Sequence, residues 1–249
     1  QAVAAMAFGT ESIPPVDVIA GPGNVYVALA KREVAGLVGV PSAFAGPSEV
    51  VVVADATVPA AFAAIDVVVQ AEHGPDGLAW LITWDEAVAD AVDAEVARIV
   101  EGSPRRDDVT ATLASAGWVV LVDGPDDALA VSDAIAPEHL QLMVAGAESL
   151  ADRVRHAGAV FCGPWSPASL GDYVAGPSHV LPTAGTARFS GALTVADFTK
   201  EVHVVTADRD ALERLAPHVA ALADAEGLDA HAESVRIRTN SSPGTGNDA

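Results

Sequence analysis

The chain has 249 residues, of which 51% are hydrophobic, and its 34 acidic and 13 basic side chains give a formal net charge of −21. This length and apolar content predict a folded protein with one large or two ordinary domains, and they exclude a disordered chain. The negative charge argues against nucleic acid or an anionic membrane as a partner.

Cysteine content and the start of the chain bear on where the protein works. The single cysteine, Cys162, excludes an internal disulfide framework, and its apolar run from Ala159 indicates a core position rather than a nucleophile. No apolar stretch reaches the roughly 18 residues of a membrane span, and no signal-peptide pattern is present, so we expect a cytoplasmic protein. Residues Gln1 to Phe8 have the pattern of the middle of a packed helix. We therefore expect the chain to be a piece of a longer one.

The first forty residues contain a partial nucleotide-binding pattern. A β-rich run from Pro15 to Ala20 leads into Gly21-Pro22-Gly23-Asn24 and a helical pattern over Val25–Gly36. A glycine-rich turn before a helix presents backbone N–H groups to an anion such as a pyrophosphate. The dinucleotide fingerprint requires a third glycine where this chain has Tyr26. The alternative, a tight turn in which Asn24 caps the helix, is equally supported.

The middle of the chain alternates apolar strands with helices, which predicts an α/β fold with a parallel sheet. The predicted strands are Val50–Ala54, Leu78–Thr83, Trp118–Val122, Leu140–Val144 and Ala159–Cys162, and the predicted helices are Pro59–Gln70, Asp85–Val100, Pro104–Ala116, Pro125–Ile135 and Ala147–His156.

The last third of the chain begins with a long segment that has no periodicity, Gly163–Ala192, and its length favours a functional loop. A strand over Val202–Thr206 and a helix over Arg209–Glu226 follow. Gly227 should end that helix, and a short helix over Ala230–Arg236 comes last. Residues beyond Arg238 have the composition of a frayed tail.

Two local patterns carry chemistry. Gln70 and His73 are three residues apart and would share one helix face, giving half of a cation site. The alternative is a solvated helix end. Glu138-His139 follows a proline at a helix-to-strand turn, which we place at the sheet edge where ligands collect in open α/β folds. A carboxylate beside an imidazole can deprotonate an alcohol or activate water, although a structural histidine at a helix end is an equal alternative.

Further polar residues could complete a metal site. Asp172 and His179 lie in the long loop, and Glu226 and His231 lie near the C-terminus. Two nitrogen and two oxygen ligands suit zinc, although no pair here has a diagnostic spacing. The ligand set would be Gln70, His73, Asp172 and His231.

Eight short motifs run in one order along nearly the whole chain, up to about Arg238. They are Ala7-Phe8-Gly9-Thr10-Glu11, Gly21-Pro22-Gly23-Asn24, Ala45-Gly46-Pro47-Ser48-Glu49-Val50, Gln70-Ala71-Glu72-His73, Pro137-Glu138-His139-Leu140, Gly171-Asp172-Tyr173-Val174-Ala175-Gly176-Pro177, His179-Val180-Leu181-Pro182-Thr183 and His231-Ala232-Glu233-Ser234-Val235-Arg236. In residue type, order and spacing they resemble the histidinol dehydrogenase family. The resemblance implies Rossmann-like parallel sheets with flanking helices, plus a small C-terminal helical segment.

The resemblance also implies an activity, the oxidation of L-histidinol to L-histidine with two NAD through a bound aldehyde. Position by position, it assigns zinc to the four ligands named above and acid–base work to Glu138 and His139. Members of the family are homodimers whose C-terminal segment crosses to the neighbour, so Glu226 and His231 would act in trans. Substrate contacts would come from Ser48, Gln70, His73, His139, Asp172, His179, Glu226 and His231, and NAD contacts from Gln1 and Asn24.

The resemblance further suggests how the chain is divided. Members of the family have a long portion ahead of the position of Gln1, so we expect this chain alone to fold or turn over poorly. The implied parts are residues 1–47, the remainder of an NAD-side Rossmann-like domain; 48–200, the main α/β domain with the zinc and acid–base residues; 201–238, the dimer-crossing segment; and 239–249, a disordered tail.

Two other functions are compatible with the same residues. A zinc-dependent hydrolase could use Glu138 as its base. A non-catalytic zinc-binding or dimerisation module would bind the metal and leave NAD unreduced. Formation of NADH from histidinol separates the dehydrogenase from both.

Overall fold

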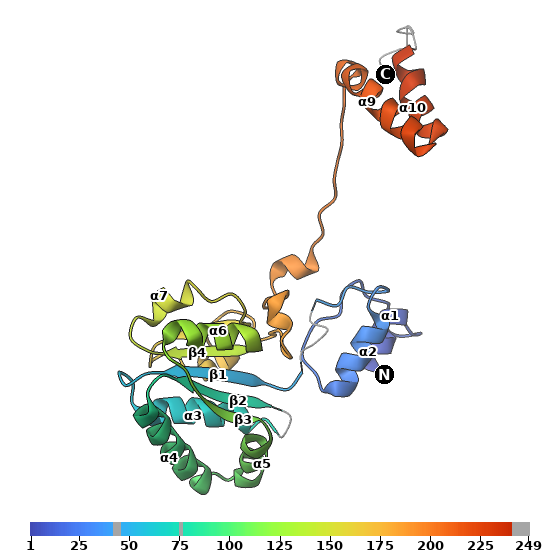
Figure 1. Ribbon diagram of the computed structural model, residues 1–249. Helices are drawn as coiled ribbons and strands as arrows, with labels where there is room; N and C mark the ends of the chain where they lie inside the picture. Colours follow the sequence, from blue (N-terminus) through green and yellow to red (C-terminus); the bar gives the residue numbers. More distant parts are fainter. Residues whose placement is uncertain (42–45, 75–76, 241–249) are drawn as a thin grey trace. The chain divides into compact units, whose positions relative to one another are not determined.

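The computed structural model of the chain describes residues 1–41, 46–74 and 77–240 (Figure 1). The chain divides into two compact units, one over Gln1–Thr199 and one that starts at Lys200. The first unit therefore includes both segments that were predicted as separate domains, 1–47 and 48–200, except for the last residue, Lys200. Among the described residues, no helix is long and apolar enough to cross a bilayer.

A parallel sheet organises the first unit. It has five strands in the order β3-β2-β1-β4-β5, the same order as the first five strands of a Rossmann sheet. This confirms the predicted α/β class, and each strand starts within one residue of its predicted start. The strands are β1 (Glu49–Ala54), β2 (Leu78–Thr83), β3 (Gly117–Leu121), β4 (His139–Met143) and β5 (Ala159–Cys162).

Helices cover both faces of this sheet, and they explain why β1 is a continuous apolar run (Figure 1). Val50 and Val52 pack toward the layer of α3 (Ala60–Ala71), α4 (Glu86–Gly102) and α5 (Arg106–Ala116). Val51 and Val53 pack toward α6 (Pro125–Ile135) and α7 (Ala147–Ala151). All four valines are completely buried.

The helix predicted over Ala147–His156 is shorter in the structure, where α7 ends at Ala151. The reason is a competing interaction, because the Asp133 carboxylate accepts hydrogen bonds from the backbone N–H groups of Arg155 and His156, each at 3.0 Å. Those N–H groups are therefore satisfied without a helix.

The N-terminal segment has its own small core, formed by Val3, Ile19 and neighbouring residues between α1 (Ala2–Phe8) and α2 (Val25–Val34). The Asn24 side chain accepts a hydrogen bond from the Val27 N–H at 3.1 Å, which confirms the capping interpretation. The strand predicted over Pro15–Ala20 is wrong. Only an isolated bridge between Val18 and Gly39 forms.

The long loop predicted over Gly163–Ala192 is largely irregular, but it contains α8 (Ala168–Tyr173) and the short helix η1 (Thr186–Arg188). A second short helix, η2 (Val195–Phe198), follows it. Thr194 and Asp197 form a reciprocal capping box at the start of η2.

The second unit is a helical hairpin of α9 (Arg209–Glu226) and α10 (Asp229–Asn240), with the predicted break at Gly227, whose φ is 71°. Helix α10 extends past the predicted end at Arg236. The strand predicted over Val202–Thr206 is wrong, because in the described chain it has no strand to pair with and Val204 is 85% exposed. The disordered tail predicted over 239–249 is wrong at its start, because Thr239 and Asn240 belong to α10, and residues 241–249 lie outside the described residues.

Candidate active site

Glu138 and His139 lie where β4 begins, beside Val50 of β1. This is the amino edge of a parallel sheet, so the predicted placement at the ligand-binding carboxyl edge is wrong. At the carboxyl edge, Asp55 links the ends of the same two strands. Its N–H donates to Met143 O at 3.1 Å, and its carboxylate accepts from the Ala145 N–H at 2.9 Å.

Glu138 is held by a reciprocal pair of hydrogen bonds with Glu49. The Glu49 N–H donates to Glu138 Oε2 at 3.0 Å, and the Glu138 N–H donates to Glu49 Oε2 at 3.3 Å. Glu49 Oε1 also accepts from the Ala184 N–H at 2.9 Å, which ties β1 to the long loop. Burial raises the pKa of Glu49, and these backbone donors oppose the rise.

Glu49 is a site residue that the sequence analysis did not single out. The available signal was an acidic residue directly before four valines, at the start of a strand that is otherwise buried. An acid in that position requires a specific set of donors.

His139 is 2% exposed and is surrounded by acceptors. Its Nδ1 lies 3.0 Å from Glu49 O and 3.4 Å from Glu138 Oε2, and its Nε2 lies 3.5 Å from Asp172 Oδ1. Its ring stacks on Phe161 with the centroids 5.8 Å apart. Burial disfavours the imidazolium, but interactions with Asp172 and Glu138 outweigh that effect and raise the pKa of His139 to about 9.

The carbonyl of Glu49 identifies which ring nitrogen of His139 is basic. A carbonyl oxygen only accepts hydrogen bonds, so Nδ1 carries the proton in the neutral ring. Nε2 then has the free lone pair. In the neutral ring, the atom that can take a proton is therefore the one on the Asp172 side.

The four predicted zinc ligands are only partly brought together. The prediction that Gln70 and His73 share one helix face is wrong, because α3 ends at Ala71. Gln70 is 1% exposed, whereas His73 lies in an exposed turn after the helix.

The other two predicted ligands lie elsewhere in the chain. The hydrogen bond with His139 lowers the pKa of Asp172 against the effect of burial, and the charges of His73 and His179 lower it further. Asp172 is thus in the electrostatic range of both histidines. His231 lies on α10 in the second unit.

Over the described ranges, no group of three or more His, Cys, Asp or Glu side chains is arranged to hold a metal. Glutamine is not one of those four residue types, and the side chain of Gln70 has a feature that fits a bound cation. Both its Oε1 and its Nε2 are buried without a hydrogen-bond partner. A buried amide oxygen without a donor suits a divalent cation, and imidazole nitrogen with carboxylate oxygen suits zinc in particular.

One pocket joins three of the predicted substrate and NAD residues. It has a volume of about 380 Å³, and Asn24, Ser48 and His73 line it together with four glycines, Gly23, Gly46, Gly74 and Gly77. Asn24 and His73 are exposed, and Ser48 is half-buried. Gln1 is exposed at the start of α1 and is not part of this lining.

A second pocket, of about 360 Å³, is lined by His179 together with Phe161, the ring on which His139 stacks, and by Cys162. Cys162 is half-buried on the edge strand β5 and packs against the core cluster on the α6 and α7 side, so its predicted core position is confirmed in part. Burial raises the pKa of its thiol, which agrees with the prediction that it is not a nucleophile.

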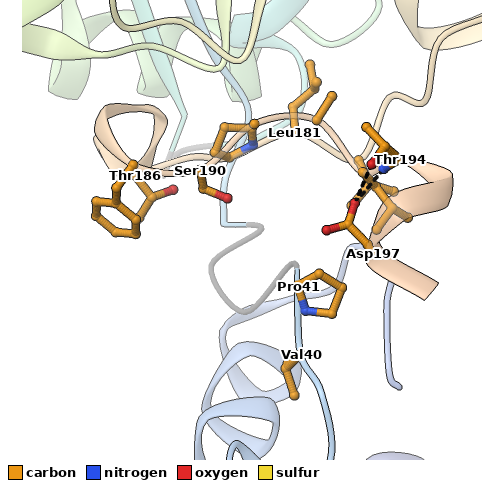
Figure 2. A pocket seen from close by; sticks show the side chains of 13 residues that line it. Val40, Pro41, Leu181, Thr186, Ser190, Thr194 and Asp197 are labelled. Carbon is orange, nitrogen blue, oxygen red and sulfur yellow. Dashed lines mark hydrogen bonds between the residues drawn. The ribbon is translucent and has the colours of Figure 1, made fainter. Parts of the chain in front are cut away.

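A third pocket, of about 330 Å³, contains none of the predicted site residues. Figure 2 shows Val40 and Pro41 on one side of it and Leu181 and Ser190 on the other, with the capping pair of η2 at its end. Two of its polar residues, Thr194 and Asp197, are hydrogen-bonded to each other, and this arrangement does not indicate a reactive centre.

The remaining predicted residues, Glu226 and His231, are exposed in the second unit, at the end of α9 and in the first turns of α10. Within the first unit, the arrangement at the amino edge places His139 between two carboxylates. The ring acts as a base in its neutral form, which its pKa of about 9 makes the minor form near pH 7. Proton transfer from a hydroxyl group or from water is the chemistry that such a set performs.

Comparison with known proteins identifies the family. A sequence model described as histidinol dehydrogenase matches residues 1–239. The histidinol dehydrogenase of Parasynechococcus marenigrum (strain WH8102) is 51% identical over 238 residues, which cover 96% of this chain and 54% of that protein. That of Bacillus cereus (strain ATCC 14579) is 48% identical, with coverage of 96% and 55%.

Solved structures agree with this result. The crystal structure of histidinol dehydrogenase from Elizabethkingia anophelis matches with a TM-score of 0.88 and 36% identity, covering 96% of this chain and 55% of that one. The chain spans about half the length of the curated relatives it matches. Sequence and fold agree along nearly all of its length, and the chain belongs to the histidinol dehydrogenase family.

Proposed function

We propose that the protein containing this chain oxidises L-histidinol to L-histidine, with NAD as the oxidant and zinc as a bound cofactor. The observation that carries the proposal is the buried His139, held between Glu138 and Asp172, with its Nδ1 3.0 Å from Glu49 O and its Nε2 3.5 Å from Asp172 Oδ1. Membership of the family supplies the substrate, since similarity to histidinol dehydrogenases covers 96% of the chain.

His139 is the base in both oxidations. Its Nε2 accepts the proton of the substrate hydroxyl while the carbinol carbon loses hydride, which leaves an aldehyde. Glu138 then takes a proton from water as the water adds to the aldehyde carbon, and His139 returns its proton to the aldehyde oxygen, which gives the hydrate and a neutral His139. His139 removes a hydroxyl proton again as the second hydride leaves, and the resulting carboxylic acid releases its proton to give the carboxylate. NAD, when bound, accepts each hydride.

Zinc is assigned to Gln70, His73, Asp172 and His231, and when bound it would anchor the imidazole and amine of the substrate. Ser48, His179 and Glu226 are assigned to the substrate, and Gln1 and Asn24 to NAD. In support, Asn24, Ser48 and His73 line one pocket. We also assign the protein to the cytoplasm and to a homodimer in which Glu226 and His231 complete the neighbouring site.

The test is to measure NADH formed from L-histidinol by the zinc-loaded protein, with the His139→Gln variant as the control. We expect two NADH for each histidine, and a loss of about 10²- to 10⁴-fold in kcat for His139→Gln with unchanged zinc content. Hydrolysis of esters or amides without NADH formation would favour the hydrolase. Zinc binding with neither activity would favour a non-catalytic module.

A further inference from the structure

Buried polar side chains without partners are concentrated at one place in the described chain. Six residues carry such atoms, and four of them belong to α3 and β4. Because an unpaired buried polar atom costs about 1–3 kcal/mol, such a concentration requires an explanation. The four residues are Asp66, Gln70, His139 and Gln141, and the other two are Trp80 and Ser132.

These atoms line one layer of the first unit. Met143 packs in the same core cluster as Val67 and Val68 of α3, so that face of β4 looks toward α3. His139 and Gln141 alternate with Met143 along the strand and share its face. The Gln141 Nε2 donates to Gly163 O at 3.2 Å, whereas its Oε1 has no partner.

The facing side of α3 carries a stripe of residues four positions apart, Phe62, Asp66 and Gln70. Phe62 meets the ring of Trp165, just after β5, with the centroids 5.8 Å apart. The stripe thus begins beside the residues that follow β5, on the face of the sheet that α3 covers. Asp66 lies one turn before Gln70 in this layer.

Asp66 is unusual among the acidic residues of the described chain. It is 4% exposed, its Oδ2 has no hydrogen-bond partner, and burial raises its pKa to about 6. An isolated buried carboxylate lowers stability, so a structural role does not account for it. A side-chain amide one turn along the same helix is a suitable donor, since Asp and Gln four apart on a helix can hydrogen-bond.

We propose that Asp66 is a positioning residue for Gln70. In the structure neither Asp66 Oδ2 nor Gln70 Nε2 has a hydrogen-bond partner. When the cation is bound, the Asp66 carboxylate would accept a hydrogen bond from Gln70 Nε2, which would turn Oε1 away from Asp66 and toward the cation. Without that acceptor, either end of the amide could face the site, and the NH₂ end repels a cation. Residues that orient a metal ligand in this way act on affinity through the ligand. The inference rests on the zinc site of the proposed function.

The experiment measures zinc affinity by competition with a chromophoric chelator for the unmutated protein and for Asp66→Ala, Asp66→Asn and Ser132→Ala. We expect Asp66→Ala to weaken zinc binding about 10- to 100-fold. Asp66→Asn keeps an acceptor oxygen and should lose less. Ser132→Ala is the matched control, because its hydroxyl is also buried without a partner but lies on α6, and it should leave the affinity unchanged.

Thermal unfolding without zinc separates positioning from folding. Both Asp66 variants should unfold at or above the temperature of the unmutated chain, because they remove an unpaired carboxylate. Unchanged zinc affinity in a folded Asp66→Ala would overturn the inference alone and leave the proposed dehydrogenase intact. An Asp66→Ala variant that does not fold would assign Asp66 a structural role and would also overturn it. If the unmutated protein binds no zinc, the metal site and this inference are both wrong.

Discussion

At the scale of single residues, the candidate site depends on which side-chain atoms already form hydrogen bonds with the backbone. Glu138 Oε2 accepts from a backbone N–H, and His139 Nδ1 donates to a backbone carbonyl. These bonds fix both side chains to β1 and leave Nε2 of His139 as the basic atom. The main chain of Glu49 makes both contacts, so one residue orients the whole acid–base pair.

Asp66 leads to a prediction for the metal-free chain. Its pKa of about 6 lies above the ordinary 3.8, so the folded state holds a proton that the unfolded chain releases between these values. The free energy of unfolding therefore falls as the pH rises through this window, and the loss remains at higher pH. Asn stays neutral, so Asp66→Asn should stabilise the chain by about 2 kcal/mol near pH 7.

Urea unfolding of both proteins at several pH values checks this prediction. The difference between them should shrink as the pH falls and vanish near about pH 3, where the carboxyl group is largely protonated in both states. A difference that does not depend on pH would mean that Asp66 affects stability by packing rather than by charge.

At the scale of elements, the sheet rather than any one helix holds the site in place. β1 and β4 are neighbours, with Val50 beside His139, so the two acidic residues that precede this pair, Glu49 and Glu138, come together as well. The same register continues with Val51 beside Leu140, at the start of the buried core. Packing in the core therefore fixes the geometry at the edge.

A large-to-small change in the core should show how much the sheet contributes to stability. Ile82 of β2 is completely buried in the cluster between the sheet and α6, and Ile82→Ala should lower the free energy of unfolding by about 2–5 kcal/mol. Ile65→Ala on α3 is the matched control, because that side chain is 42% exposed, and it should cost less than about 1 kcal/mol. Chemical denaturation measures both, and equal losses would contradict the assigned core.

At the scale of the whole molecule, the assigned site residues come from both compact units. Gln70, His139 and Asp172 belong to the first unit, and Glu226 and His231 to the second. Extended residues with exposed valines, such as Val204 and Val205, precede the helical hairpin of the second unit. A segment of this kind is compatible with the proposed exchange between subunits, in which His231 serves the neighbouring chain.

Mixing two inactive variants tests that exchange. His231→Ala should lose zinc, whereas His139→Ala should keep zinc and lose turnover, because only the first removes an assigned ligand. If His231 acts in trans, a heterodimer has one site with both unmutated residues. We expect activity to return on mixing, up to about a quarter of normal when subunits exchange at random. No recovery after verified subunit exchange would contradict the crossing segment.

The sequence predicted helices and strands best where the spacing of apolar residues along the chain matched the pattern of buried side chains in the structure. The predicted bounds are correct for four elements, β2, α6, β5 and α9. Their ends are marked by local signals, namely the alternation of strands with helices along the chain and capping residues such as Asp208. The prediction failed at Val202–Thr206, where the residues favour a strand but the described chain provides no partner. Strand formation depends on that partner, which no local pattern reveals.

For the site, the sequence by itself determined the family, and it predicted the acid–base pair, since Glu138 and His139 are adjacent and lie in a specific motif. Only the tertiary structure decided that this pair lies at the amino edge of the sheet, that Glu49 holds it, and that Asp66 is buried one turn from Gln70. The physical reason is that residue type and local order are encoded along the chain. Strand register, burial and unpaired hydrogen-bonding atoms arise only when distant segments pack together.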